Sequence, residues 1–153
     1  MNQSAPTQLN DPNQALKTLR ILWAGITFGL VAAGAVIVAV TINQPDPGPV
    51  SFGPVRVGTL ALGALILLMG MGYFIRLQVY KAGWDTNCVK PAAYVQGNLI
   101  LFAMVEAVGI LSVVLGGFIG DRFACFAIAT AALFALILNF PNGGPLRPAE
   151  PRL

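Results

Sequence analysis

Hydrophobic residues along this chain gather into four long blocks, at about residues 21–42, 55–77, 94–118 and 122–140. Each block is close to the roughly 20 residues that a helix needs to cross the hydrocarbon core of a bilayer. The blocks lack the apolar–polar alternation of strands, and in lipid only helices or closed barrels satisfy every backbone polar group. The pattern therefore predicts an all-α fold, an integral membrane four-helix bundle.

Polar segments mark the ends of this predicted domain. Residues 1–11 lack the basic and then apolar pattern of a cleavable signal peptide, so we expect a disordered N-terminal tail. Asp11 followed by Pro12 is typical of a helix start. The four-helix transmembrane domain is thus predicted over 12–140. Residues 141–153 open with PNGGP, which ends a helix, and we expect them to form a C-terminal tail.

Two internal segments connect the predicted spans. Residues 43–54 are dense in Pro and Gly and are expected to be an exposed, non-helical link. Residues 76–91 are the most polar internal segment. Aromatic side chains gather around them, at Tyr73, Tyr80, Trp84 and Tyr94. They suit an aromatic belt at the membrane surface, and a binding surface for a partner or lipid headgroup is the alternative.

Composition supports lipid as the main surroundings of the chain. Hydrophobic residues make up 56% and charged residues 10%, with a mean hydropathy of +0.74. A soluble domain usually has about a quarter of its residues charged. The lipid bilayer is therefore the expected partner. Nucleic acid is not, because the basic residues stand singly at helix ends. With two Cys and no His, we expect no metal site and no cofactor.

Basic residues predict the orientation, since cytoplasmic loops of membrane proteins are enriched in Lys and Arg. One side of the predicted bundle carries Lys17, Arg20, Arg76, Lys81, Lys90, Arg147 and Arg152, and the other carries Arg56 and Arg122. This asymmetry predicts a multi-pass protein of the bacterial inner membrane with both termini in the cytoplasm. Cys88 and Cys125 then fall on opposite sides and cannot form an intramolecular disulfide.

Small residues recur at helical spacing in every predicted span. They are Gly25, Gly29 and Ala33 in the first, Gly63 and Gly70 in the second, Gly109 and Gly116 in the third, and Ala127 and Ala131 in the fourth. Small residues let helix backbones approach closely in membranes. We expect these positions to pack within the bundle. For the first span, a face for a homodimer is the alternative.

Glu106 is the single acidic residue at predicted membrane depth. It lies midway between Tyr94 and Phe118, about 18 Å of helix from either end at 1.5 Å per residue. An ionised carboxylate at that depth costs about 2.5–3.5 kcal/mol on insertion scales, and no basic residue lies at the midplane. The sequence therefore predicts a protonated carboxyl at Glu106.

The helix face of Glu106 predicts that this carboxyl points inward. Asn98, Gly109 and Gly116 share its face, which indicates protein rather than lipid opposite. We expect a hydrogen bond from Glu106 to a polar neighbour. The candidate partners are Thr130, Thr27 and Asn98.

The residues AMVEAVG, at 103–109, resemble the carboxylate-bearing helix of the ATP synthase c subunit, the rotary proteolipid. The second and third spans are similar in direction to the proteolipid hairpin. Lys90-Pro91 stands where that family has Arg-Gln-Pro, and the resemblance covers under half of the chain. It implies that Glu106 carries an ion. The whole chain also resembles small four-pass bacterial membrane proteins of unknown function.

Two functional hypotheses follow. The first is a structural or interaction subunit, with a buried protonated Glu106, that forms a homo-oligomer or joins a larger membrane complex. The alternative is a proteolipid-like subunit that translocates a proton or cation through Glu106. An enzyme is not expected, because the chain has no His and no Ser/Lys or paired-acid arrangement at one depth.

Overall fold

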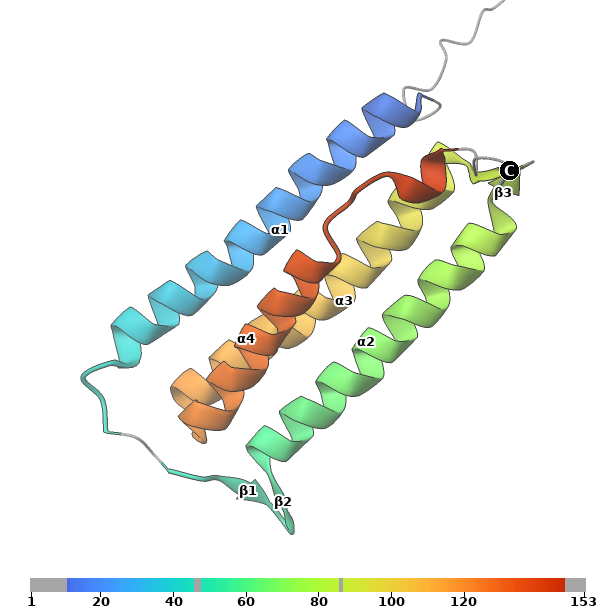
Figure 1. Cartoon of the computed structure of the whole chain (residues 1–153). Coiled ribbons are helices and arrows are strands. Elements are labelled where there is room, and N and C mark those ends of the chain that lie inside the picture. Colours follow the sequence, from blue (N-terminus) through green and yellow to red (C-terminus); the bar gives the residue numbers. More distant parts are fainter. Residues whose placement is uncertain (1–10, 46–47, 86, 148–153) are drawn as a thin grey trace, which may run out of the picture.

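The computed structural model describes residues 11–45, 48–85 and 87–147. These residues form four α-helices: α1 (Pro12–Thr41), α2 (Val57–Ala82), α3 (Pro91–Phe118) and α4 (Arg122–Leu138). The helices alternate in direction along the chain (Figure 1). The prediction of an all-helical bundle is confirmed. The predicted N-terminal tail lies, up to residue 10, outside the described residues.

Three short elements accompany the helices. Strands β1 (Ser51–Phe52) and β2 (Val55–Arg56) form one antiparallel hairpin, and β3 (Trp84–Asp85) and β4 (Cys88–Val89) form another. A 3-10 helix, η2 (Gly144–Leu146), follows α4. The hairpins fall within or beside the segments expected to be connections, so they shorten two links without adding a layer to the fold.

α3 is the central element of the bundle. It contacts each of the other three helices, while α1 and α2 lie on opposite sides of the α3–α4 pair (Figure 1). Its inward side chains, such as Phe102, Val105 and Val108, are at most 2% exposed. On the outer helices, in contrast, Phe28 is 74% and Ile66 is 67% exposed. The described part of the bundle is therefore apolar both inside and outside, as expected of a protein whose surroundings are lipid.

Three of the helices, α1, α2 and α3, are long and apolar enough to cross a membrane. α4 is equally apolar but has 17 residues, which corresponds to roughly 26 Å of helix.

Local sequence explains where the helices begin. The Asp11 side chain accepts from the Asn13 amide at 2.9 Å, and a proline occupies the first position of both α1 and α3.

The α3–α4 turn is tied to the link between α1 and α2. Asp121 adopts a left-handed conformation, with φ 59°, and its Oδ2 accepts from the Gly58 amide at 3.2 Å. A carboxylate at this position stabilises the N-terminal end of α2. Arg122 donates to the carbonyls of Gln44 and Pro45 at 3.0 and 3.4 Å. The link expected to be merely exposed is thus fixed at both of its ends.

The predicted C-terminal tail is packed against the bundle as far as it is described. Pro141 and Leu146 are buried, and the Gly143 amide donates to the Tyr94 hydroxyl at 3.1 Å. Arg20 Nε donates to the Pro141 carbonyl at 3.2 Å. Residues 139–147, the C-terminal segment, therefore cover one end of α1 and α3. The remainder of the predicted tail, from residue 148, lies outside the described residues.

The small residues divide into two groups. A Cβ added at Gly109 would lie 2.8 Å from Leu30 Cδ1, and one at Gly116 would lie 2.7 Å from Cys125 Cβ, so α3 uses both for close packing. The structure corrects the expectation for others. Gly25, Gly63 and Gly70 have no neighbouring described atom within 4 Å of an added Cβ, and Ala127 and Ala131 are exposed. These five lie on the outer surface, and Ala33 is half-buried.

Candidate functional site

Glu106 lies on the side of α3 that faces α1. A Cβ added at Gly29 would lie 3.5 Å from Glu106 Oε1, so the carboxyl sits directly beside the glycine backbone of α1. Leu30, the next residue of α1, lies against Gly109, which is three residues beyond Glu106 on α3. Glu106 itself is half-buried. The carboxyl therefore lies within a helix–helix interface, where the absence of a side chain at Gly29 leaves room for it.

The predicted polar partners of Glu106 lie elsewhere. Asn98 Nδ2 donates to the Tyr80 hydroxyl and to the Tyr94 carbonyl, and Thr130 is exposed and donates to the Phe126 carbonyl of its own helix. Thr27 Oγ1 is buried and has no hydrogen-bond partner among the described residues. Within the described part of the chain, Glu106 makes no hydrogen bond or ion pair either. The expectation of a hydrogen bond from Glu106 to one of these three side chains is wrong.

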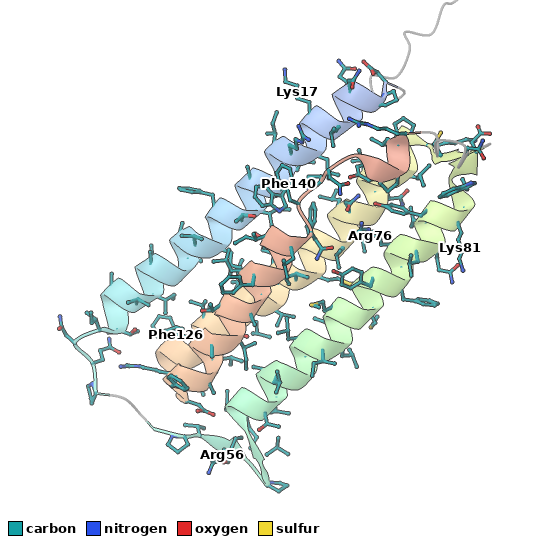
Figure 2. All side chains as sticks on the ribbon, in the orientation of Figure 1. Lys17, Arg56, Arg76, Lys81, Phe126 and Phe140 are labelled. Atoms are coloured by element: carbon teal, nitrogen blue, oxygen red, sulfur yellow. The ribbon has the colours of Figure 1, made fainter. Side chains whose placement is uncertain are left out.

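A second polar site lies near the C-terminal end of α2, which Figure 2 shows around the labelled Arg76. Arg76 Nε donates to the Tyr80 hydroxyl at 3.2 Å, and Arg76 Nη1 donates to Asn139 Oδ1 at 3.1 Å. The Tyr73 hydroxyl lies 2.9 Å from the same Asn139 oxygen. Together with Asn98, these residues form what we call the Arg76 cluster.

The Arg76 cluster connects α2, α3 and the C-terminal segment. Asn98 on α3 is 1% exposed and binds Tyr80 on α2. The rings of Tyr80 and Tyr94 stack with centroids 5.8 Å apart, and the Arg76 guanidinium lies 5.2 Å from the Tyr80 centroid. Tyr94 in turn holds the C-terminal segment through Gly143. Stacking and cation–π contacts of this kind add to the hydrogen bonds and fix the direction of the guanidinium.

The charge of Arg76 has no counter-charge within the described residues. The one ion pair there joins Lys90 Nζ to Asp85 Oδ2 at 3.8 Å, on the exposed hairpin β3–β4. Arg76 is half-buried, and both of its side-chain hydrogen bonds go to neutral oxygens. The site therefore offers an oriented cation to an anion.

Sequence reasoning missed this cluster. The sequence pattern links Arg76 to the orientation of the bundle, the tyrosines to an aromatic belt, and Asn98 to Glu106. The spacing carried a usable signal, because Arg76 and Tyr80 are four residues apart, as are Tyr94 and Asn98. Residues at that spacing share a helix face. The contact between the two pairs, and the hydrogen bonds of Asn139, depend on how α2, α3 and α4 pack against one another.

Comparisons with protein-family models, with curated proteins and with solved structures find no match to this chain. Within residues 11–45, 48–85 and 87–147, no group of three or more His, Cys, Asp or Glu side chains is arranged to hold a metal ion. Two features are the candidates for a functional role: the Glu106 carboxyl beside Gly29 and the oriented guanidinium of Arg76.

Proposed function

We propose that this protein is a small structural or interaction subunit of the bacterial inner membrane. The observation that carries the proposal is the filled interior around α3. Phe102, Val105 and Val108 are at most 2% exposed and occupy the space between the helices. A bundle packed in this way leaves little volume for a solute, whereas its broad apolar exterior suits contact with lipid and with other membrane helices.

In this proposal the chain crosses the membrane four times. α1, α2 and α3 have the length and apolar character for this, and α4 together with the residues that follow it completes the fourth crossing. Lys17, Arg76 and Lys81 lie toward the end of the bundle where α1 begins and α2 finishes, and Arg56 lies at the other (Figure 2). Arg122, the first residue of α4, is also at this other end. The enrichment of basic residues in cytoplasmic loops supports cytoplasmic termini.

Glu106 then is a neutral side chain that occupies the space beside Gly29, between α1 and α3. The test compares Glu106→Gln with Glu106→Asp, measured as the membrane level and the size of the complex on native gels in mild detergent. Gln keeps the shape and polarity of a protonated carboxyl, so we expect no change in either quantity. A complex that survives Glu106→Asp but is lost in Glu106→Gln would contradict this role.

A second function, translocation of a proton or cation through Glu106, is favoured by one observation. The carboxyl lies beside Gly29, and no described residue is hydrogen-bonded to it. Such a group is able to exchange a proton. A hydrophobic carbodiimide should then label Glu106 in intact membranes, and proteoliposomes should show a proton flux that Glu106→Gln abolishes. Absence of both the labelling and the flux would leave the structural role.

A further inference from the structure

α2 and α4 leave an apolar groove on the outside of the bundle. Its volume is about 400 Å³, and its lining includes Leu65, Met69, Ala131 and Phe134. Tyr73 and Asn139 line it as well and are hydrogen-bonded to each other. We call this feature the α2–α4 groove. It is apolar over most of its lining and ends at two residues of the Arg76 cluster.

The groove leads toward the Arg76 guanidinium. α2 and α4 run in the same direction, since Gly58 contacts Asp121 near their starts and Tyr73 contacts Asn139 near the end of α4. α4 ends at Leu138, whereas α2 continues to Ala82. This leaves about 13 Å of α2 beyond the level of Asn139. Arg76 is therefore located just past the apolar groove, where the headgroup of a lipid in the groove would lie.

The surroundings of the Arg76 guanidinium favour the binding of an anion. Tyr80 and Asn139 orient the guanidinium, and the described residues supply it with no carboxylate. Arg presents a planar fork of donors that matches a phosphate, and it is less strongly hydrated than Lys, which favours binding at a half-buried position.

We propose that the α2–α4 groove and Arg76 together bind one anionic phospholipid, with the phosphate at Arg76 and an acyl chain in the groove. A free phosphate would use Arg76 alone and would leave the groove without a role. A zwitterionic lipid carries its own cation, which opposes Arg76. The site should therefore prefer phosphatidylglycerol to phosphatidylcholine. This inference requires insertion in a membrane but is independent of the role given to Glu106.

Native mass spectrometry of the full chain tests the proposal. The protein is released from nanodiscs that contain equal amounts of phosphatidylglycerol and phosphatidylcholine, and the lipid that stays bound is counted. Because a charge-assisted contact is at stake, we expect one phosphatidylglycerol to be retained with about a tenfold preference. Equal retention of the two lipids would overturn the proposal.

Two alanines of α4 provide a matched pair of variants. Ala131 lines the groove, whereas Ala127, one turn earlier, is also exposed but is not part of its lining. Ala131→Phe should fill the groove and abolish retention of phosphatidylglycerol, while Ala127→Phe should leave it unchanged. If Ala131→Phe retains the lipid as the native chain does, the groove is not the site and the proposal is wrong.

Variants of Arg76 separate a lipid from a free anion. Arg76→Gln should reduce the preference for phosphatidylglycerol to near unity, and Arg76→Lys should keep part of it. Inorganic phosphate added before release should not displace the bound lipid. Displacement by inorganic phosphate would show a simple anion site and contradict the lipid. The Ala131 pair leaves the Arg76 cluster intact, so it decides the question even if Arg76→Gln fails to fold.

Discussion

The Arg76 cluster and the Glu106 interface place a chargeable side chain between helices in opposite ways. Arg76 lies near the end of α2 and has two hydrogen-bond partners, Tyr80 on the same helix and Asn139 directly after α4. Glu106 lies in the middle of α3, beside a glycine of α1 and without a hydrogen bond among the described residues. Arg76 belongs to a hydrogen-bond network, whereas Glu106 only occupies the space that Gly29 leaves open.

This difference follows from depth. Near a helix end, chain turns and connecting segments bring further polar groups within reach, as the C-terminal segment does for Tyr94 through Gly143. In the middle of an apolar helix the neighbours are apolar side chains, and an acid surrounded by them is least costly when it is neutral. At Arg76, the loss of a hydrogen-bond partner should therefore lower the free energy of unfolding most. At Glu106, a change in the packing of the neighbouring helix should have the larger effect.

Asn139→Leu is expected to give the largest loss of stability. It removes the acceptor for both Tyr73 and Arg76 and leaves a half-buried guanidinium with one partner fewer. Such a loss costs about 2–4 kcal/mol in the free energy of unfolding. Unfolding of the purified protein in mixed micelles of increasing denaturing detergent measures it. A loss below about 0.5 kcal/mol would mean that the cluster does not stabilise the bundle.

Asn98→Leu should have the next largest effect. Asn98 is 1% exposed and donates to Tyr80 and to the Tyr94 carbonyl. Leucine keeps the branched shape but has bulkier methyl groups, so the loss combines the missing hydrogen bonds with overpacking and is about 1–3 kcal/mol in the same unfolding assay. A stability equal to that of the native chain would place Asn98 outside the network in solution.

Gly29→Leu should weaken the interface at Glu106 through packing. A Cβ at this position already contacts Glu106 Oε1 at 3.5 Å, so the longer side chain must displace α1 or the carboxyl. We expect a loss of about 1–3 kcal/mol, the range for overpacking a filled site.

Gly25→Leu is the matched control for Gly29→Leu. It lies one turn earlier on α1, where an added Cβ meets no described atom within 4 Å. Its unfolding free energy should change by less than about 0.5 kcal/mol, as for surface positions. Equal losses for the two variants would show that the contact with Glu106 is not the cause, because leucine is the better helix former and propensity alone would raise the stability of both.

Glu106→Leu should give the smallest change. The carboxyl makes no described hydrogen bond, so leucine removes a polar group without leaving a partner unsatisfied. The free energy of unfolding should rise or stay within about 1 kcal/mol of the native value. A loss comparable to that of Asn98→Leu would reveal a hydrogen bond of Glu106 and would remove the contrast between the two sites.

Much of the fold could be predicted because it depends on local pattern. The four apolar blocks predict the four helices, and Asp11 with Pro12 predicts the first residue of one of them. The central position of α3 could not be predicted in this way. Four apolar helices of similar length give no sign in their sequences of which one the others surround, because lipid and protein neighbours favour the same side chains.

Glycine illustrates the same limit within the candidate site. Gly63 and Gly70 on α2 and Gly109 and Gly116 on α3 are both pairs seven residues apart. The second pair lies against neighbouring helices and the first pair faces outward. Glu106 lies on the side of α3 that faces α1. Its position beside Gly29 depends on how α1 packs, and the Arg76 cluster depends on three helices meeting.

The C-terminal segment also has a consequence for biogenesis. Residues 139–147 follow all four helices in the chain, yet they bind Arg20 near the start of α1 and Tyr94 near the start of α3. During synthesis these contacts can form only after the last helix has been made. The last contacts that hold the first helix to the bundle therefore come from a short stretch of backbone that is synthesised after all four helices.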